Sequence, residues 1–455
     1  MEHTMSPTSV QEPVRTTPVF GEYDVVVMGG GPAGLAAATS AAKNGASVLL
    51  IERYGFLGGM GTAAGVTNFC GLHANVFGEI KQVVHGVADD LLNRMAELNG
   101  LNPPHLVLGK VHAQAYDMSA LKCAADAMLI DAGVQILFHA LGAGITMAED
   151  GRIESLLLET KSGRVAVRAG IFIDCSGDAD LAYWAGALYE KGEGPGQMLY
   201  PTMMFRIGNV NAEEAGQAWR TIPKIMAEAQ RSGAYQFPRQ GAVVRPQKHP
   251  YEWRVNVTQL KSPDGSATDG TDARALSAGE VEGRRQIVDY LRFLRNEIPG
   301  FQEAYALDIA TQLGIRETRR IVGEYMLTGE DVLSCARFDD SIGVNGWPLE
   351  KHVAGDVIWE WPPIPGSCGY NQLPYRMLLP RRTEQDKALN LLVAGRCASM
   401  THDGQSAARV TGACFVMGEA AGVAAVLALR DRVAVHDVNV SELQQILTAQ
   451  GVFLG

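Results

Sequence analysis

The sequence predicts an α/β fold, in which helices cover a parallel sheet and a second, α+β domain is inserted into the chain. A buried β-branched run near the N-terminus is followed by a glycine-rich turn, an alanine-rich helix and another buried run. Later helix-then-strand units extend the same pattern. Between about residues 195 and 385 the composition changes, with more aromatic residues, more prolines and longer loops, before the first pattern returns.

The first strand, turn, helix and second strand lie within Asp24–Glu52. The run DVVVM is typical of a strand buried on both faces. The pattern GxGxxG follows, in which the three glycines permit a tight turn, close approach of a pyrophosphate and close packing of helix on sheet: Gly29, Gly31 and Gly34. The second strand ends on Glu52, which is placed to accept hydrogen bonds from a ribose. Because these features occur in register, the sequence predicts a Rossmann-like nucleotide-binding unit.

The composition excludes several classes of protein. Of 455 residues, 39 are Lys or Arg and 50 are Asp or Glu, and no basic run stands out, so we expect no nucleic-acid partner. Val25–Ala42 is uncharged, but three consecutive glycines and a proline within it argue against a membrane span. Seven cysteines without a CxxC pair predict neither a redox disulfide nor a metal site. Residues 1–20 are polar and lack the apolar segment of a signal peptide, so we expect a disordered tail on a cytoplasmic protein.

The rest of the first domain is predicted from helix and strand signals taken in order. The glycine-rich residues 53–71 form a loop, and an amphipathic helix over Asp89–Asn99 belongs to an excursion near residues 63–112. A helix over Ser119–Ala132 and the strand after it extend the parallel sheet. A hairpin follows, pairing residues 152–160 with 165–168, and then a buried strand leads into the turn SGDAD.

In the second domain, Ser277 and Glu280 form a predicted capping box before a core helix. The arginines of the block 313–332 have two interpretations: they bind an acidic ligand, or they form salt bridges with Glu317, Glu324 and Glu330. These arginines are Arg316, Arg319 and Arg320. An aromatic cluster either lines an apolar pocket or fills the core, and consists of Trp347, Trp359, Trp361 and Tyr370. After residue 390 a buried strand and a helix of small residues, about Arg409–Leu429, return to the first domain.

Three blocks carry a family resemblance: Asp24–Thr62, which ends in GFLGGMGT, then 313–332, and 389–425. They resemble the FAD-dependent oxidoreductases of the succinate dehydrogenase and fumarate reductase-like group, and more narrowly a bacterial family of FAD-dependent oxidoreductases. The resemblance implies a discontinuous FAD-binding domain of the glutathione reductase type, residues 21–194 plus 386–455, and an inserted substrate or cap domain, residues 195–385.

The resemblance also implies which residues contact FAD. The helix that starts near Arg409 is expected to point its N-terminus at the flavin pyrimidine, where a helix dipole stabilises the anion of the reduced ring. Asp178 is expected to bond the ribityl or pyrophosphate part. The full set of expected contacts is Gly29, Gly31, Pro32, Ala33, Gly34, Glu52, Arg53, Gly58, Gly59, Thr62, Asp178, Gly395, Arg396, Arg409 and Val410.

The expected reaction is dehydrogenation or oxidation of a small organic substrate by hydride transfer to flavin, with oxygen, a quinone or a carrier protein as electron acceptor. The alternatives are a flavin-dependent monooxygenase and a flavin-bound lyase or hydratase without net redox. No second GxGxxG is present for an NADPH module. The candidate catalytic residues are His402, Arg376 and His352, with Tyr370 and His73 behind them, because histidine accepts protons near neutral pH and arginine clamps carboxylates. The oligomeric state is left open.

Overall fold

The computed structural model describes residues 10, 12–382 and 389–455, and its central feature is a seven-stranded sheet. Strand β1 (Val19–Met28) pairs in parallel with β2 (Val48–Ile51) on one side and with β11 (Gly163–Asp174) on the other. The parallel part is completed by β8 (Gln135–Leu137) beside β2 and β22 (Leu391–Val393) beside β11. Val25–Val27 are fully buried, as a strand covered on both faces requires. The α/β prediction is confirmed at this level.

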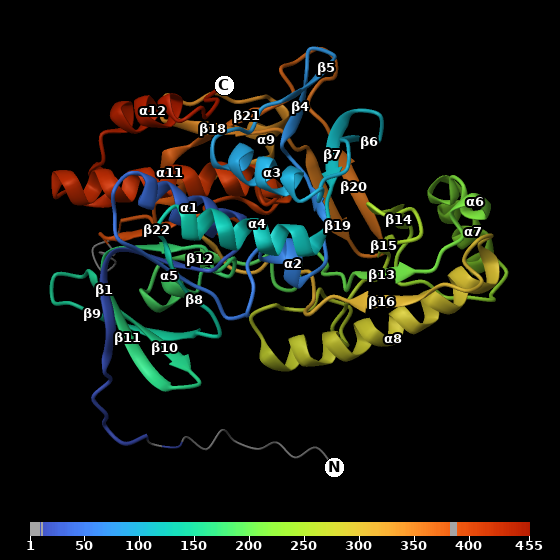
Figure 1. The fold of residues 1–455 in the computed structure, drawn as a ribbon, viewed down its shortest axis with the longest axis horizontal. Coiled ribbons are helices and arrows are strands. Elements are labelled where there is room, and N and C mark those ends of the chain that lie inside the picture. Colours follow the sequence, from blue (N-terminus) through green and yellow to red (C-terminus); the bar gives the residue numbers. More distant parts are fainter. Residues whose placement is uncertain (1–9, 11, 383–388) are drawn as a thin grey trace.

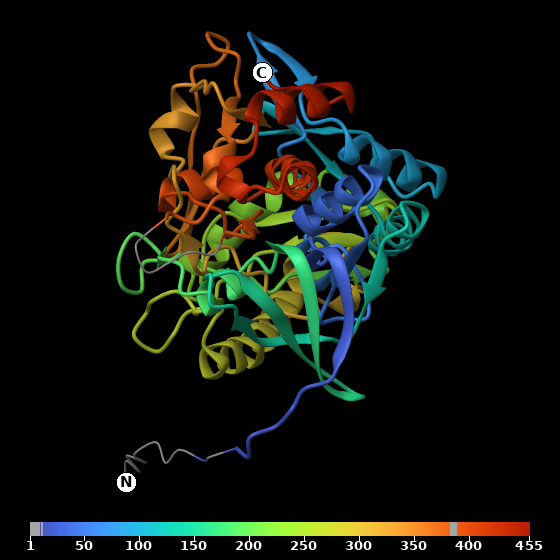
Figure 2. The same ribbon diagram turned by 90° about the vertical axis from the view of Figure 1, so that its left-hand side faces the viewer.

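Strands β9 (Leu141–Met147) and β10 (Ile153–Thr160) add an antiparallel edge to the sheet through the first half of β11. The hairpin was predicted, but residues 165–168 and the buried strand after them form one continuous strand, so the two separate strands expected there are wrong. The long β11 therefore belongs to both parts of the sheet. In Figure 1, helices α1 and α11 lie above the parallel strands of the sheet, and β9 and β10 lie below them. Figure 2 shows the same arrangement end-on.

Helices α1 (Pro32–Lys43) and α11 (Thr411–Asp431) cover the sheet and pack closely on each other. A Cβ on Gly418 would lie 2.0 Å from the carbonyl oxygen of Ala33, and one on Gly422 would lie 2.4 Å from that of Ala37. The small residues of α11 are thus required by the approach of two backbones. Helix α11 is long and apolar enough to cross a membrane, but 89% of its most apolar window is buried inside this fold.

The excursion after the glycine-rich loop adds small elements beside α1. Helix α3 (Val87–Glu97) and helix α4 (Met118–Asp131) lie close to their predicted positions. The remaining elements of this region are α2 (Met60–Ala63), β3 (Asn68–Phe69), β4 (His73–Val76), β5 (Glu79–Gln82), β6 (His105–Val107) and β7 (Val111–Ala115). Farther along follow α5 (Asp180–Trp184) and β12 (Tyr189–Glu190).

A second unit is built on an antiparallel sheet in the order β14-β15-β13-β16 and on the long helix α8 (Ala273–Glu297). Its core joins apolar side chains of α8 to those of the sheet. The predicted capping box is wrong, because the N-cap of α8 is Asp272, five residues before Ser277, and its side chain accepts a hydrogen bond from the amide of Ala275. The other elements are β13 (Phe205–Gly208), α6 (Ala212–Ala215), α7 (Ala218–Arg231), β14 (Val243–Pro246), β15 (Trp253–Asn256) and β16 (Tyr305–Ile309).

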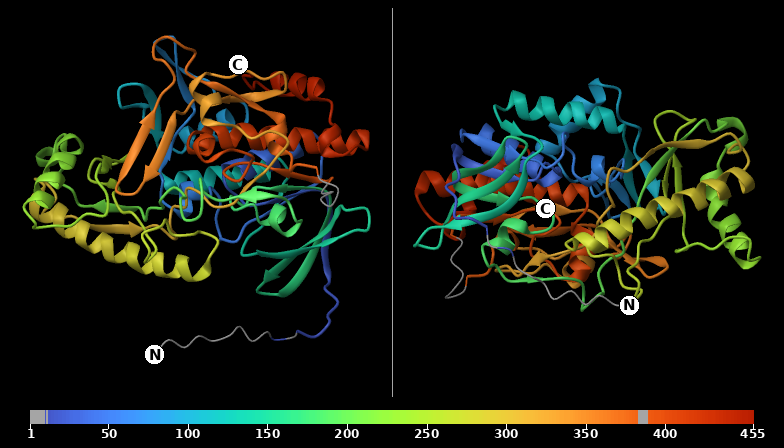
Figure 3. Two further views of the ribbon diagram at one scale, coloured as in Figure 1. Left: turned by 180° about the vertical axis from the view of Figure 1, so that it is seen from behind. Right: turned by 90° about the horizontal axis from the view of Figure 1, so that it is seen from below.

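Residues 316–382 connect the second unit back to the sheet. Side chains between Leu327 and Leu379 belong to the same hydrophobic core as α1 and α11, whereas the core of the second unit ends at Ile315. The elements here are β17 (Arg320–Ile321), α9 (Gly329–Leu333), β18 (Ser341–Asn345), β19 (Leu349–Val353), β20 (Asp356–Glu360), β21 (Asn371–Pro374) and the 3₁₀ turn η1 (Tyr375–Leu378). In Figure 3 the β19–β20 hairpin (orange) reaches toward the four-stranded sheet.

The predicted boundaries at 194 and 385 remain a proposal, and core membership favours ending the second unit near residue 315. The boundary at 386 lies outside the described residues. Of the tail predicted at 1–20, residues 1–9 and 11 also lie outside them, residues 12–18 have no regular structure, and β1 already begins at Val19. The chain ends with α10 (His402–Ala408), α11, the 3₁₀ turn η2 (Val435–Asp437) and α12 (Val440–Ala449).

Candidate active site

A cavity of about 590 Å³ lies between the carboxyl ends of the parallel strands and the sheet of the second unit. Residues at the ends of β1, β2 and β11 and just after β22 line one end: Met28, Ile51, Cys175 and Ala394. Arg254 of β15 and His352 of β19 line the other. A ligand site at the carboxyl ends of the strands is the usual place in an open α/β sheet.

The glycine turn between β1 and α1 opens into this cavity. Gly31 is the N-cap of α1, no side chain caps the helix, and Pro32 occupies the first turn, so the first amides are free to bind an anion. A Cβ on Gly31 would meet only the Cα of Gly59, at 3.6 Å. Gly29 has a φ of +107°, which favours glycine, and a Cβ there would lie 2.3 Å from the carbonyl oxygen of Cys175. The turn therefore leaves space and donors for a diphosphate.

Glu52 lies at the end of β2 in the wall of the cavity and is 7% exposed. Its Oε2 accepts a hydrogen bond from the amide of Gly30 at 2.8 Å, and its Oε1 accepts one from the amide of Tyr54 at 3.0 Å. These bonds hold the carboxylate in place. Each oxygen retains acceptor capacity, so the group fits the ribose of a dinucleotide.

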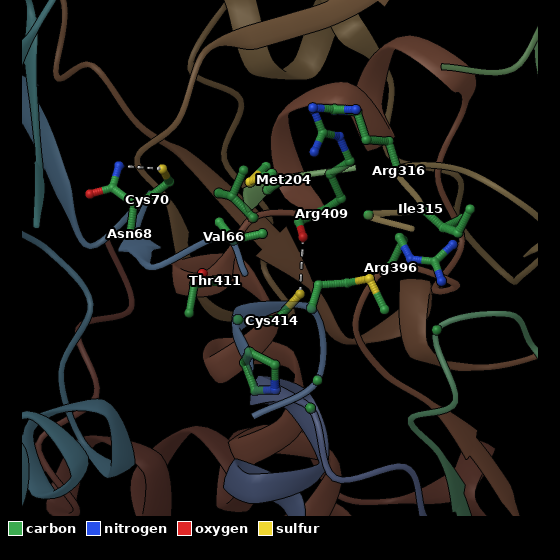
Figure 4. A pocket seen from close by; sticks show the side chains of 18 of the residues that line it. Val66, Asn68, Cys70, Met204, Ile315, Arg316, Arg396, Arg409, Thr411 and Cys414 are labelled. Carbon is green, nitrogen blue, oxygen red and sulfur yellow. Dashed lines mark hydrogen bonds between the residues drawn. The ribbon is translucent and has the colours of Figure 1, made fainter. Parts of the chain in front are cut away.

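The start of α11 also faces the cavity. The structure corrects the single helix expected from Arg409, because α10 ends before Arg409 and α11 begins at Thr411, after Val410 as N-cap. No side chain caps α11, and Thr411 and Cys414 line the cavity (Figure 4). A free helix N-terminus stabilises negative charge, so this position fits a reduced flavin ring. The break brings Arg409 itself into the cavity wall.

Most of the residues expected to contact FAD line this one cavity: Gly29, Gly31, Pro32, Ala33, Glu52, Arg53, Gly59, Gly395, Arg396, Arg409 and Val410. Gly34, Gly58 and Thr62 lie behind the wall. A Cβ on Gly34 would lie 1.8 Å from the carbonyl oxygen of Gly29, so Gly34 serves the packing of helix on strand. The hydroxyl of Thr62 donates to the carbonyl of Leu57 at 2.7 Å and supports the loop.

Asp178 does not line this cavity but a neighbouring pocket, together with Arg53 and Arg396, so its expected contact with FAD stays a prediction. Arg396 donates to its Oδ1 at 2.8 Å and the hydroxyl of Thr318 donates to the same oxygen at 2.7 Å. Burial opposes its ionisation, but Arg396 holds the pKa of Asp178 below its ordinary value. Asp178 therefore positions Arg396, which does line the cavity.

Of the catalytic candidates, His352 lies in the cavity wall, on β19, and is 4% exposed. Its Nε2 lies 3.2 Å from Oε1 of Glu350. Burial and the nearby charge of Arg316 lower the pKa of His352 well below its ordinary value, so the imidazole is neutral at neutral pH. Glu350 also accepts a hydrogen bond from Nε1 of Trp347 at 3.0 Å, and its pKa is about 2, because His352, Arg409 and Trp347 outweigh the effect of burial.

His402 and Arg376 do not line the cavity. His402 opens α10, and its Nδ1 lies 2.9 Å from Oε2 of Glu317, a buried carboxylate that also pairs with Arg320. His402 is therefore not placed to accept a proton in this cavity, because helix α10 separates it from the start of α11. Arg376 is half exposed and forms an ion pair with Asp340 at 2.9 Å, so it does not clamp a ligand in this cavity.

Tyr370 and His73, the two weaker catalytic candidates, also do not line the cavity. Tyr370 packs edge-on against Phe453, and His73 packs edge-on against His112. The aromatic cluster divides: Trp347 and Trp359 line the cavity, whereas Trp361 stacks on Trp359 from behind. Of the four aromatic residues expected to line a pocket or fill the core, Trp347 and Trp359 line the cavity, whereas Trp361 and Tyr370 do not.

The three arginines of the 313–332 block have different surroundings: two form ion pairs and one lines the cavity. Arg320 forms an ion pair with Glu317, as the salt-bridge interpretation predicted, whereas Arg319 pairs with Asp180, which lies outside the block and was not among the predicted partners. Arg316 instead lines the cavity, together with Arg239 and Arg254 of the second unit, which the sequence did not single out. Isolated arginines in loops and strands give no sequence signal. Only the packing of the second unit against β19 brings them together.

Comparison with known proteins agrees with this site. A family model described as FAD dependent oxidoreductase matches residues 24–447, which is most of the chain. The chain belongs to this family. It is an enzyme, an FAD-dependent oxidoreductase, and FAD is its cofactor.

More distant similarities were also found. A segment of 45 residues is 51% identical to dihydrolipoyl dehydrogenase of Trypanosoma brucei brucei, which covers 10% of this chain and only 9% of that protein. Among solved structures, a geranylgeranyl bacteriochlorophyll reductase-like protein from Thermoplasma acidophilum has 14% identity and a TM-score of 0.45, over 96% of this chain and 94% of that one. The p-nitrophenol 4-monooxygenase of Pseudomonas putida has 12% identity and a TM-score of 0.47, over 95% and 89%. Likenesses this distant carry no argument about the reaction.

Proposed function

We propose that this FAD-dependent oxidoreductase is a dehydrogenase or oxidase that removes hydride from a carbon of a small organic substrate. The observation that carries the proposal is the buried pair of His352 and Glu350, which lies in the same cavity as the glycine turn and the start of α11. A dehydrogenation needs an electron acceptor and a proton acceptor in one enclosed site. Bound FAD supplies the first, by accepting two electrons as hydride.

Three groups of this chain hold the cofactor in the proposal. The free amides at the start of α1 bind the diphosphate, the carboxylate of Glu52 accepts from the ribose, and the start of α11 faces the flavin. Gly31 leaves room for the phosphates, since a Cβ there would have only one neighbour. Arg396, held by Asp178, supplies positive charge at the same end.

His352 is the proposed proton acceptor. The carboxylate of Glu350 can only accept, so the nitrogen facing it, Nε2, carries the hydrogen, and Nδ1 is the basic atom. As hydride leaves the substrate carbon, Nδ1 takes the proton of the adjacent hydroxyl or amine. The low pKa of His352 keeps Nδ1 unprotonated before the reaction, and Glu350 stabilises the imidazolium formed.

The remaining features of the proposal concern the surroundings. The second unit acts as the lid that holds the substrate determinants, the electron acceptor is oxygen, a quinone or a carrier protein, and the enzyme works in the cytoplasm. Membership of the succinate dehydrogenase and fumarate reductase-like group is part of the same proposal.

Anaerobic mixing of the FAD-loaded enzyme with small organic substrates tests the reaction class. Loss of the yellow colour with substrate alone supports a dehydrogenase or oxidase. Loss of colour only after NADH or NADPH is added contradicts it and identifies a monooxygenase. Turnover of substrate without loss of colour contradicts it in favour of a lyase or hydratase.

A further inference from the structure

Four arginines surround the carboxylate of Glu350 in the inner part of the cavity, and they leave an excess of positive charge. Three are almost fully buried, with 2% of Arg239, 6% of Arg254 and 6% of Arg316 exposed, and the side chain of Arg409 is 12% exposed. Burial lowers the pKa of each guanidinium group, and the charge of Glu350 opposes that lowering in all four. Of the four, only Arg409 has a carboxylate of the described residues within ion-pair distance, Glu350 at 3.8 Å, although Asp356 acts on Arg239 and Glu317 on Arg409 from farther away. Buried guanidinium groups without a paired carboxylate are costly unless an anion compensates them.

The hydrogen bonds of these arginines hold them in place without neutralising them. Arg316 donates from one nitrogen to the carbonyl of Tyr200 and the hydroxyl of Thr202, both at 2.7 Å. Arg239 donates to the carbonyl oxygens of Gly241 and Asn256, and Arg254 to that of Val66. All these acceptors are uncharged. Among the described residues, no carboxylate lies within ion-pair distance of Arg239, Arg254 or Arg316.

Several donors of the cluster have no partner at all. The Nε groups of Arg239, Arg254 and Arg409 are buried and make no hydrogen bond within the described part of the chain. A buried donor without a partner costs about 1–3 kcal/mol. Figure 4 shows the side chains of Arg316 and Arg409 next to each other on one side of the cavity. The cluster is therefore oriented and desolvated, and it offers charge-assisted hydrogen bonds that the protein itself does not use.

The phosphates of FAD do not account for this charge. The arginines at the glycine end of the cavity have carboxylates of their own, because Arg396 pairs with Asp178, and the charges of Asp178 and Glu52 act on Arg53. The unpaired cluster instead includes Arg239 and Arg254 of the second unit, beyond the sheet that carries the glycine turn. Apolar side chains line the cavity near it, from Trp347, Trp359, Met204 and Val66.

We propose that the arginine cluster binds the carboxylate of an organic acid, the substrate of this enzyme, with Arg316 as the main anchor and the tryptophan side chains against its carbon skeleton. That the acid is the substrate rests on the proposed function. That the arginine cluster binds it does not. Guanidinium groups match a carboxylate in shape and bind it in two-point fashion. The carboxylate also brings negative charge beside His352, so substrate binding strengthens the base that then accepts its proton.

Calorimetric titration of the oxidised, FAD-loaded enzyme tests the binding without requiring turnover. The probes are three acids, benzoate, indole-3-acetate and succinate, the neutral benzamide, and inorganic phosphate. We expect saturable binding of at least one acid, with benzamide and phosphate bound at least about 10-fold more weakly. In Arg316→Gln the affinity for the acid falls at least about 10-fold, Arg316→Lys loses less, and the exposed Arg292→Gln matches the wild type.

Four results would overturn the inference: no acid binds, benzamide binds as well as the acid, phosphate binds as well as the acid, or Arg316→Gln binds the acid normally while retaining FAD. If Arg316→Gln does not fold, Arg254→Gln takes its place. An acid that binds without ever bleaching the flavin supports this inference and counts against the proposed dehydrogenation. If the enzyme binds no acid but a neutral compound bleaches its flavin, the proposed dehydrogenation is supported and this inference is contradicted.

Discussion

Nε2 of His352 lies 3.2 Å from Oε1 of Glu350, and Oε2 of the same carboxylate lies 3.8 Å from the guanidinium group of Arg409 in the arginine cluster. One carboxylate therefore determines both the tautomer of the histidine and the electrostatics of the inner cavity. Burial and Arg316 lower the pKa of His352, so a bound anion that screens Arg316 should raise it. The base, the anion site and the cofactor site form one connected system in this account.

The first prediction separates the two histidines that the sequence proposed. His352→Asn should slow anaerobic reduction of flavin by substrate at least about 100-fold while FAD stays bound, because the proton acceptor is lost. His402→Asn should leave the reduction rate within a few-fold of wild type and lower thermal stability instead, since it removes a partner of the buried Glu317. Stopped-flow absorbance of the two variants, each with measured FAD content, shows which histidine is needed for reduction of the flavin. The reverse pattern would return the catalytic role to His402.

The second prediction concerns the space above Gly31. Gly31 has a φ of −76°, which alanine adopts easily, and a Cβ there meets only one atom, at the ordinary distance of 3.6 Å. Gly31→Ala should therefore fold normally but lose FAD, because the methyl group occupies the space of the diphosphate. Gly34→Ala should destabilise the protein itself, since its Cβ would lie 1.8 Å from a carbonyl oxygen. Circular dichroism and FAD content measure both effects. Full FAD retention in Gly31→Ala would show that the diphosphate lies elsewhere.

The third prediction tests the ribose acceptor. Glu52→Gln should weaken FAD binding by roughly 1 kcal/mol or more, because a charge-assisted hydrogen bond becomes a neutral one. The amide nitrogen would also face the amide of Gly30 or Tyr54, both of which need an acceptor. Equilibrium release of FAD, followed by fluorescence, measures the change, and exposed Glu97→Gln is the control. Unchanged retention would remove Glu52 from the cofactor site.

The fourth prediction is a pH dependence of stability that is independent of the active site. Glu419 is buried in α11, accepts a hydrogen bond from the amide of Val87 at 3.0 Å, and has a pKa raised by burial from 4.5 to about 7. A raised pKa in the folded state means that its contribution to stability is complete below pH 4.5 and is lost as pH rises through about 7. Glu419→Gln should therefore stabilise the protein at pH 8 by on the order of 2–3 kcal/mol and change little at pH 4. Thermal melts that shift equally at both pH values would contradict this.

The strand-turn-helix-strand unit that lines one end of the cavity could be predicted from the sequence because it is local. The strand, turn, helix and acid of 24–52 lie next to one another in the chain, and each residue type has a geometric reason to be there. The prediction failed where neighbours in sequence are separated by a helix. His402 precedes α11 by only nine residues, but the unpredicted helix α10 turns it toward Glu317.

The inner cavity could be predicted only in part. Arg316 was recognised as a possible ligand residue, but its block also contains two arginines that form structural ion pairs, and spacing alone does not distinguish them. Arg239 and Arg254 come from the second unit and reach Glu350 only through tertiary packing. Burial without a counter-charge is a property of the fold, and it is the property that identifies these residues.

The central claim is that an organic acid alone gives its electrons to the flavin in this cavity. Single-turnover stopped-flow absorbance of the anaerobic, FAD-loaded enzyme, mixed with increasing concentrations of an acid that binds by calorimetry, tests it most directly. We expect complete bleaching without NADH or NADPH, at a rate that saturates with acid concentration, and half-saturation at a higher concentration in Arg316→Gln. Flavin that stays oxidised at saturating acid and bleaches only when NADH or NADPH is added would contradict the account.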